Sequence, residues 1–297
     1  MKLSVVVVAY NQSPYIRQCM DSVLAQRLDA PWEIVVADDA STDGTADILR
    51  GYAARFPDRV RLIAHPINRG LLSNLGAALA ATRGEFIAYI DGDDYWTHPR
   101  KLARQIQLLE TDPRAALCFH SSRIVLGHRP GGMLTPPGRR ERYHARDLLW
   151  TNFIPAQSIV YRRAALFELP APPSENQATA WDWYCHILAT RTAPALYLDD
   201  CLSAYRVHSG GLWTSQSLAR RLQTQLTVLT QVQPFLPETL SSRLRMARLR
   251  IRFQLLKAHT HQLLFSDPVD THDECGTQPA APPPVGEDKI SRATRNE

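Results

Sequence analysis

The sequence predicts an α/β protein built on a doubly wound, mostly parallel sheet. Strand-like apolar runs and helix-like amphipathic segments alternate through the first 120 residues, and short polar clusters follow several of the runs. Such alternation produces parallel strands joined by right-handed helical crossovers. Ligands of these sheets bind beyond the carboxyl ends of the strands, which is where the polar clusters fall.

Five apolar runs are the predicted strands, at residues 3–9, 33–37, 60–64, 86–90 and 115–120. The first of them, Leu3–Ala9, is a nearly continuous β-branched run, which is typical of a parallel strand buried on both faces. The segments between the runs carry apolar residues at helical spacing. They predict helices around residues 16–24, 46–52, 72–81 and 99–110.

The middle of the chain is less regular. Gly127–Gly138 holds four glycines and three prolines, so we expect a loop there and a candidate lid. Ser158–Tyr161 predicts a strand and Trp181–Ala189 a helix. Leu196–Val207 resembles a further pair of strands.

The end of the chain differs from the rest in composition. Beyond about residue 214 the pattern is helical throughout, and from Ser266 prolines and polar residues dominate. Segments of that composition do not bury enough apolar surface to fold. We therefore expect an α/β domain at residues 1–215, a helical extension at 216–265 and a disordered tail at 266–297. The oligomeric state stays open.

Composition excludes several classes of protein. The chain is 44% hydrophobic and 21% charged, which is ordinary for a globular protein. Its net charge of +5 is too small and too scattered to indicate nucleic acid, although it suits a diphosphate substrate or an anionic membrane surface. Five cysteines without CxxC spacing favour a reducing compartment, and no apolar run approaches the roughly 18 residues of a spanning helix. We expect a cytoplasmic protein, soluble or peripheral at the inner face of the membrane.

Carboxylates gather after two of the predicted strands. Asp38 and Asp39 follow the second run, and Asp91, Asp93 and Asp94 follow the fourth. Neighbouring parallel strands would bring them to one crevice, where their mutual repulsion needs a cation or a donor-rich ligand. Such oxygen ligands suit Mg²⁺ or Mn²⁺ bound together with substrate phosphates. Each segment alone also fits a turn or a helix cap, but their joint occurrence favours a metal–diphosphate site.

In order and spacing these segments resemble family-2 glycosyltransferases, which have the Rossmann-like GT-A fold. The resemblance covers about residues 1–215, and its motifs are specific to the family but not to a substrate. The segments that carry it are Ser4–Asn11, Val36–Thr45, Asn68–Gly70, Asp91–Asp94, Pro155–Ser158, Asp182–Tyr184 and Tyr205–His208.

The resemblance implies an enzyme of cell-surface polysaccharide biosynthesis that transfers a sugar with inversion. The donor would be a nucleotide-diphosphate sugar, UDP- or dTDP-linked, with GDP still open. The acceptor would be a hydroxyl of a glycan, a lipid-linked molecule or a small molecule. A divalent cation, Mg²⁺ or Mn²⁺, would neutralise the charge that builds on the leaving diphosphate. Attack on an oxocarbenium-like anomeric carbon, from the face opposite the diphosphate, would invert it.

The resemblance also implies which residues bind the nucleotide. Ala9, Tyr10 and Asn11 would line the nucleotide pocket, with Tyr10 stacking on or bordering the base. Asp39 would bind the edge of a pyrimidine. The segment Asn68-Arg69-Gly70 would lie near the ribose or the diphosphate.

A second set of residues would surround the diphosphate and the metal. Asp91 would approach the ribose, and Asp93 would ligate the cation. Asp94 would hold a metal-bound water or a hydroxyl of the donor sugar, and Arg206 is a further candidate contact. His208 is a candidate ligand of the metal or of the diphosphate, with a purely structural role as the alternative.

Asp182 is the expected general base. Family members carry the base as an acid at a helix start, commonly preceded by a second acid, and here Trp181 stands in that preceding position. Aromatic neighbours would raise the pKa of Asp182 and suit it to the role. The alternative is that Asp182 only caps the helix.

Tryptophans suggest an acceptor platform, because sugar rings stack on aromatic faces. The candidates are Trp181, Trp183 and Trp213, and the alternative for each is ordinary core packing.

The helical extension carries an unusual number of cations. Leu244, Ile251 and Leu255 are among its apolar residues, and its cations are Arg243, Arg245, Arg248, Arg250, Arg252 and Lys257. A basic amphipathic helix can lie on an anionic membrane. Packing on the catalytic domain with the arginines in water is the favoured alternative, since the apolar positions cover more than one narrow face.

Two other functions compete with the transferase. A sugar nucleotidyltransferase shares the fold plan but needs a glycine-rich, basic loop after the first strand, and Ala9–Ser13 is not such a loop. A non-catalytic nucleotide-sugar-binding or scaffold protein would keep the fold without turnover. The presence of Asp91, Asp93 and Asp182 argues against it.

Overall fold

The computed structural model of the chain describes residues 1–127, 129–170 and 180–265, with side chains of the last helix up to residue 258. The segment predicted to be a disordered tail, 266–297, lies outside the described residues.

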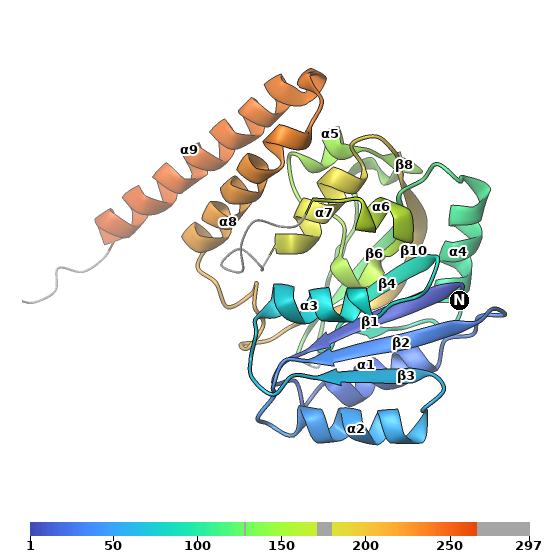
Figure 1. Cartoon of the computed structure of the whole chain (residues 1–297). Coiled ribbons are helices and arrows are strands. Elements are labelled where there is room, and N and C mark those ends of the chain that lie inside the picture. Colours follow the sequence, from blue (N-terminus) through green and yellow to red (C-terminus); the bar gives the residue numbers. More distant parts are fainter. Residues whose placement is uncertain (128, 171–179, 266–297) are drawn as a thin grey trace, which may run out of the picture.

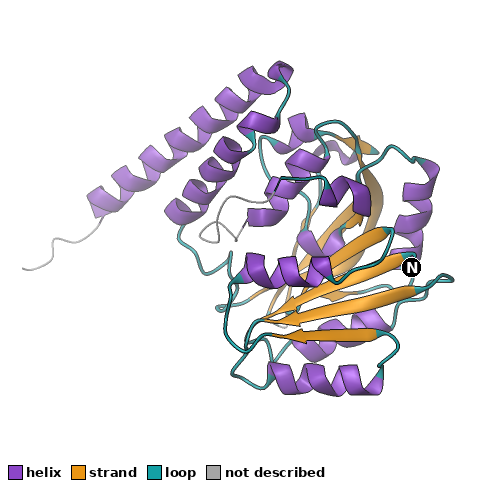
Figure 2. Cartoon of the chain, in the orientation of Figure 1, coloured by secondary structure: helices purple, strands orange, loops and turns teal. Residues whose placement is uncertain are grey.

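A single mixed sheet runs through the molecule in the strand order β3-β2-β1-β4-β9-β6-β10-β5 (Figures 1 and 2). Strands β3, β2, β1 and β4 are mutually parallel, β10 is parallel to β6, and β9 is antiparallel to both β4 and β6. The predicted α/β class with a mostly parallel sheet is therefore confirmed. The strands are β1 Leu3–Ala9, β2 Trp32–Asp38, β3 Val60–Ala64, β4 Phe86–Asp91, β5 Tyr95–Trp96, β6 Leu117–Leu126, β7 Arg129–Leu134, β8 Arg142–Tyr143, β9 Val160–Arg162 and β10 Ala195–Val207.

Helices cover both faces of this sheet (Figure 2). Alternate residues of β1 enter different cores: Val6 and Val8 pack with α3 and α7, and Val5 and Val7 pack with α1, α2 and α4. Burial on both faces explains why β1 is apolar at nearly every position. The helices are α1 Ile16–Leu24, α2 Thr45–Arg55, α3 Leu71–Ala80, α4 Lys101–Thr111, α5 Ala145–Leu148, α6 Arg163–Phe167, α7 Trp181–Ala189, α8 Leu218–Gln231 and α9 Ser241–Phe265.

Two expectations for the middle of the chain were wrong. Half of Gly127–Gly138, expected as a loop, is strand β7, which pairs antiparallel with β6 at the edge of the sheet. An edge strand needs only backbone pairing on one side, so glycine and proline are tolerated there. Leu196–Val207, expected as two strands, lies within the single strand β10. The turn expected there is a register irregularity around Cys201, next to an ion pair between Asp200 and Arg104.

Helices α8 and α9 form a hairpin beside the α/β domain (Figure 1). Leu244, Ala247 and Ile251 of α9 are buried, and they share a core with Val228 and Leu229 of α8. This core is continuous with the residues of α7 that pack on the sheet. None of the helices in the described ranges combines the length and the apolar character that crossing a bilayer requires.

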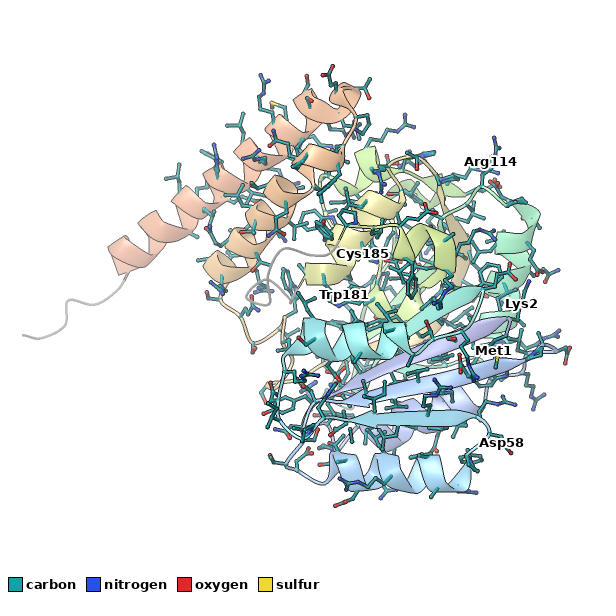
Figure 3. All side chains as sticks on the ribbon, in the orientation of Figure 1. Met1, Lys2, Asp58, Arg114, Trp181 and Cys185 are labelled. Atoms are coloured by element: carbon teal, nitrogen blue, oxygen red, sulfur yellow. The ribbon has the colours of Figure 1, made fainter. Side chains whose placement is uncertain are left out.

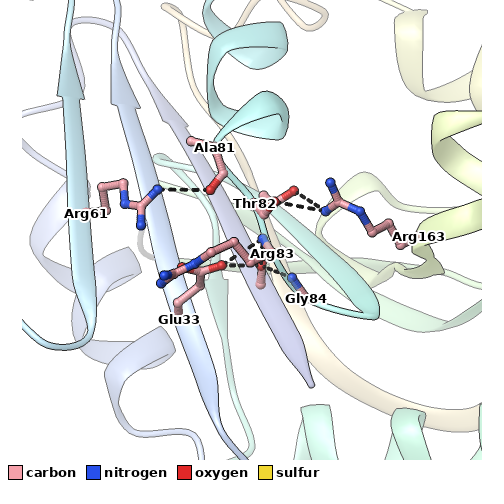
Figure 4. A network of polar contacts seen from close by, with 8 residues as sticks. Glu33, Arg61, Ala81, Thr82, Arg83, Gly84 and Arg163 are labelled. Atoms are coloured by element: carbon pink, nitrogen blue, oxygen red, sulfur yellow. Dashed lines mark hydrogen bonds and ion pairs between the residues drawn. The ribbon is translucent and has the colours of Figure 1, made fainter. Parts of the chain in front are cut away.

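A buried polar network fastens the amino ends of β1 and β2 to the turn before β4 (Figure 4). Glu33 accepts hydrogen bonds from Ser4 Oγ at 2.8 Å and from the Arg83 guanidinium at 2.6 Å. Burial alone would raise the pKa of Glu33, but these hydrogen bonds lower it below its usual value. Ser4 Oγ also accepts the backbone N–H of Gly84 at 2.8 Å. The network fixes how close the turn approaches β1.

We expect Gly84→Ala to destabilise the fold by about 2 kcal/mol or more. The added Cβ would lie 2.3 Å from Ser4 N and 2.5 Å from Leu3 C, in the backbone of a central strand that cannot move aside. Gly51→Ala in α2 is the matched control, because nothing lies within 4 Å of the Cβ it would add. That change should be neutral or stabilising by up to about 1 kcal/mol. Urea unfolding measures both, and equal effects of the two variants would contradict this packing.

Candidate active site

The carboxyl ends of β1, β2 and β4 meet at one edge of the sheet. Strand β1 lies between the other two, with Ala9 in register with Asp38 and Val8 in register with Asp91. The pairing brings together the two carboxylate clusters that the sequence separates by about fifty residues. The predicted crevice at this edge therefore rests on the pairing of neighbouring parallel strands.

The loops after β1 and β2 are fastened to each other. Asn11 has a left-handed backbone, with φ of 52°, and its N–H donates to Ser41 Oγ at 2.9 Å. Its side-chain oxygen accepts Thr42 N–H at 2.8 Å. Asp38 accepts a hydrogen bond from the Ser41 hydroxyl at 2.6 Å, so this carboxylate stabilises the loop after β2. Tyr10, at the tip of the β1 loop, is 48% exposed and available to an incoming ring.

Asp39 organises the next part of the edge. Its carboxylate is buried and accepts the backbone N–H groups of Arg69 at 2.8 Å and Gly70 at 2.9 Å. Gly70 immediately precedes α3 and has a φ of 85°, a conformation that favours glycine. Asn68 and Arg69 are exposed beside it. The structure thus brings Asp39 and the segment 68–70 into direct contact.

The second carboxylate cluster surrounds a tight turn at the end of β4. Gly92 N–H donates to Val8 O at 2.9 Å, and Asp94 N–H donates to Asp91 O at 3.1 Å. A Cβ on Gly92 would lie 2.2 Å from Gln12 Oε1 and 2.8 Å from Ile16 Cδ1, so a larger residue would have to displace these two side chains. The two backbone hydrogen bonds keep the three aspartates in one turn beside β1.

Burial and electrostatic repulsion raise the pKa of two of these carboxylates, Asp91 and Asp94. Burial, helped by the charge of Asp93, raises the pKa of Asp91 to about 8. The same causes raise the pKa of Asp94 well above its usual value. Asp94 is 1% exposed, and its Oδ2 atom has no hydrogen-bond partner. The cluster therefore has an unmet demand for positive charge.

Arg206 supplies part of that charge. Its backbone N–H donates to Asp94 Oδ1 at 2.7 Å, and its Nε donates to the Asp93 carbonyl at 2.7 Å. The guanidinium carbon lies 4.7 Å from the ring centre of Tyr15 and 5.2 Å from that of Tyr95, which holds the group in place. Sequence comparison with the family suggested Arg206 only as a general contact, and the structure gives it a defined position against the turn.

His208 meets Asp93 across the same space. His208 Nε2 lies 3.0 Å from Asp93 Oδ2, and its ring packs 4.6 Å from that of Tyr15. A carboxylate oxygen and an imidazole nitrogen are both atoms that can ligate Mg²⁺ or Mn²⁺, and here they are two, not three. Among the described residues, no group of three or more His, Cys, Asp or Glu side chains is arranged to hold a metal ion. The residues present fit a cation that the protein shares with a phosphate ligand.

Asp182 lies in the first turn of α7, facing the cluster. Burial raises its pKa to about 6, against a hydrogen bond from Asn152 Nδ2 at 2.8 Å that favours the ionised form. The charge of Asp182 in turn contributes to the raised pKa of Asp91. Tyr89 links Asp91 to α7, because its hydroxyl donates to Asp91 and its ring packs edge-on against Trp181 at 4.8 Å.

Four residues of this site were not among the sequence candidates. Asn152 binds Asp182, and its Oδ1 lies 3.2 Å from Nδ1 of the buried His186. The Tyr89 hydroxyl donates a hydrogen bond to Asp91. The pKa of Tyr205 is raised by burial and by the charges of four aspartates, Asp94, Asp91, Asp93 and Asp182. Tyr205 begins the segment Tyr205–His208 and could have been proposed from it. Nothing in the sequence around Asn152 indicates that it meets α7.

The tryptophans divide between core and site. Trp183 is 1% exposed, and its indole N–H donates to Leu148 O at 2.8 Å, so it is a core residue and not an acceptor platform. Trp181 lies between α7 and the sheet (Figure 3), mostly buried against Tyr89. Trp213 is half-buried against the same core. The interpretation of an aromatic platform is wrong for Trp183.

Comparison with known sequences identifies relatives. The profile described as glycosyl transferase family 2 matches residues 4–169. An uncharacterized protein of Mycobacterium tuberculosis is 38% identical over 221 residues, which are 74% of this chain. The match spans 62% of that relative's length. The putative teichuronic acid biosynthesis glycosyltransferase TuaG of Bacillus subtilis is 35% identical over 206 residues, 69% of this chain and 79% of its own.

Solved structures share the fold. TarS of S. aureus, residues 1–349 in complex with UDP, superposes with a TM-score of 0.67 at 20% identity, covering 90% of this chain and 76% of that one. The mannosyltransferase PcManGT of Pyrobaculum calidifontis, in complex with GDP-Man and Mn²⁺, superposes with a TM-score of 0.61 at 21% identity and the same coverage. Both similarities concern the fold.

We expect the free energy of unfolding of the wild type to fall relative to that of Asp182→Asn as pH rises from about 4 to 8. The folded chain holds the Asp182 proton more tightly than the unfolded chain, whose aspartates titrate near about 3.9. This preference stabilises the folded chain fully at pH values below the pKa of the unfolded aspartate. The stabilisation is lost as pH rises through about 6, the pKa of Asp182 in the folded chain. The total change should approach about 3 kcal/mol, measured by chemical denaturation at each pH.

The control for this experiment is Asp47→Asn, which alters an exposed carboxylate on α2. A plot of its free energy of unfolding against pH should run parallel to that of the wild type. A difference between wild type and Asp182→Asn that stays constant with pH would contradict the raised pKa of Asp182.

Proposed function

The chain belongs to glycosyl transferase family 2, and from that premise we propose that it transfers a sugar from a nucleotide-diphosphate donor to an acceptor hydroxyl, with inversion at the anomeric carbon. The single observation that carries the proposal is the meeting of three elements at one sheet edge. Support comes from the loops after β1 and β2, which lie beside the Asp91–Asp94 turn at the ends of paired strands, and from Asp182, whose charge acts on Asp91.

The donor would lie along the carboxyl ends of β1, β2 and β4. In this proposal Ala9, Tyr10 and Asn11 border the nucleoside, and Asp39 uses the free lone pairs of its carboxylate to bind the base. Asp91 approaches the ribose. A uridine or thymidine diphosphate is preferred, and the UDP in the TarS complex supports this choice. GDP stays open, because PcManGT has the same fold and its structure contains GDP-Man.

A divalent cation fits beside the diphosphate. Asp93 and His208 would hold Mg²⁺ or Mn²⁺, with Asp94 Oδ2 available to a water or a sugar hydroxyl, and the ion would neutralise charge on the leaving diphosphate. The Mn²⁺ of the PcManGT complex supports this proposal. Arg206 keeps the Asp93–Asp94 turn in shape while the ion and the diphosphate bind.

Asp182 would accept the proton of the acceptor hydroxyl. With a pKa of about 6 it is mostly ionised at neutral pH and still basic enough to take a proton. Asn152 donates to Asp182 Oδ2 and so orients the carboxylate, and His186 orients Asn152. Attack by the activated hydroxyl from the face opposite the diphosphate inverts the anomeric carbon.

The acceptor is proposed as a hydroxyl of a glycan, a lipid-linked molecule or a small molecule. The name of TuaG, a putative teichuronic acid biosynthesis enzyme, supports a role in cell-surface polysaccharide synthesis. In the same proposal the enzyme works in the cytoplasm, free or at the inner face of the membrane. Of the rivals, a nucleotidyltransferase remains disfavoured, since the segment Ala9–Ser13 has no glycine. A scaffold protein without turnover is the competitor that the next experiment addresses.

We expect one member of a panel of UDP-, dTDP- and GDP-sugars to bind only in the presence of Mn²⁺ or Mg²⁺. Asp93→Ala should abolish that binding, because it removes a ligand of the ion. Asp182→Asn should bind the donor normally but turn it over roughly 10²- to 10⁴-fold more slowly. Calorimetry measures binding, and release of nucleoside diphosphate by hydrolysis or transfer measures turnover. Wild-type turnover should rise with pH through about 6, as Asp182 loses its proton.

Asp47→Asn serves as the control and should match the wild type in both assays. If no nucleotide sugar binds under any condition, the transferase proposal fails. Donor binding without turnover in the wild type would instead favour a scaffold.

A further inference from the structure

Helix α9 carries two apolar stripes on opposite faces. Leu244, Ala247, Ile251 and Leu255 form the inner stripe, which is buried against the rest of the protein. Met246, Leu249, Phe253 and Leu256 follow at intervals of three and four residues and are 54%, 49%, 58% and 66% exposed. At about 3.6 residues per turn, each set lies on one face, and the two faces point in opposite directions. We call the exposed set the outer stripe.

Cations border the outer stripe along both edges. The same helical spacing puts Arg243 and Arg250 on one side of it and Arg245 and Arg252 on the other. The sequence of Ser241–Phe265 contains no Asp or Glu. In the described part of the chain, none of these four arginines forms an ion pair with a carboxylate. Arg250 donates instead to the Trp150 carbonyl, and Arg243 and Arg250 lie over the Trp150 ring.

A groove beside the outer stripe has the same charge. Three arginines line it, Arg245, Arg248 and Arg252. Leu236, Leu244 and Gln233 are among its other lining residues. Arg248 donates to Gln233 Oε1 at 2.6 Å, which aligns one of them. No carboxylate is among the residues that line this groove. The groove therefore suits an anionic group such as a phosphate.

We propose that the outer stripe of α9 docks on an anionic phospholipid surface, with its apolar side chains in the boundary between headgroups and acyl chains and the flanking arginines on the phosphates. An exposed apolar face bordered by cations is the pattern of helices that lie in a membrane interface. Charge complementarity selects the partner, since each basic residue near an anionic bilayer adds to the attraction.

A second copy of the chain fits this surface less well. A helix seam between two copies carries opposite charges along its edges, so that they attract across the interface. Both edges of the outer stripe are positive, and two copies would repel each other. The inner stripe is already used by α8 and cannot serve a partner.

The apolar residues singled out from sequence, Leu244, Ile251 and Leu255, pack on the protein, so a membrane interpretation based on them is wrong. Packing on the protein describes the inner stripe, and the membrane proposal concerns the outer stripe. Figure 1 shows α9 projecting on the side to which the carboxyl ends of β1–β4 point. The inference does not depend on the proposed transferase activity, because lipid binding needs no sugar donor.

Co-sedimentation of the full chain with vesicles tests the proposal. We expect the wild type to bind phosphatidylcholine vesicles that contain roughly one-third phosphatidylglycerol and to remain unbound with pure phosphatidylcholine. The double change Met246→Ser and Phe253→Ser should weaken binding about tenfold or more by removing apolar area. Arg245→Gln with Arg252→Gln should weaken it about 30-fold, at roughly fivefold per charge.

The matched control is Leu126→Ser with Met133→Ser, which removes two similarly exposed apolar side chains from the β6–β7 edge and should leave binding unchanged. Thermal unfolding followed by circular dichroism verifies that each variant is folded. Equal binding by wild type and the outer-stripe variant would overturn the proposal, as would binding that ignores the anionic lipid. A dimer that Phe253→Ser dissociates, without vesicle binding by the wild type, would assign the stripe to a second copy and also overturn it.

Discussion

Repulsion among buried carboxylates is the constraint on which the rest of this site depends. Asp91, Asp93 and Asp94 occupy one turn, and burial together with their mutual charge raises the pKa of both Asp91 and Asp94. Arg206 is the cation in contact with the turn, and it leaves Asp94 Oδ2 without a partner. Burying such a cluster lowers the stability of the fold, and binding of a positively charged ligand raises that stability again.

The sheet and its loops hold the cluster in place against that repulsion. Strand β1 pairs with β4 up to Asp91, and Gly92 allows the turn to close on Gln12. At the opposite end, the network of Ser4, Glu33 and Gly84 fixes the start of the same strands. Asp182 approaches the cluster from a different layer, on α7, whose Trp181 packs against Tyr89. The site therefore joins a rigid sheet edge to a helix whose position depends on core packing.

Sequence reasoning succeeded where local chemistry determines structure. Apart from Ser4, strand β1 is apolar because both faces are buried, and the predicted strand Val60–Ala64 has the same bounds as β3. It failed where the outcome depends on distant contacts. Asn152 meets Asp182 only through the packing of α5 and α7, and β7 forms from glycines and prolines because β6 offers it an edge. In α9 the apolar residues lie on two opposite faces, so the sequence pattern did not single out one apolar face.

The most direct test of the account compares the unfolding temperatures of wild type and Asp94→Asn, with and without Mn²⁺ and a nucleoside diphosphate. Without ligands the variant should be the more stable, because it loses a buried like charge and keeps the acceptor for Arg206 N–H. With both ligands the wild type should gain more than the variant does, by up to about 3 kcal/mol at saturating concentrations. Two results together would contradict the claim that a bound cation compensates this cluster. They are a lower stability of the variant than of the wild type without ligands, and an equal gain in stability of the two proteins when the ligands are added.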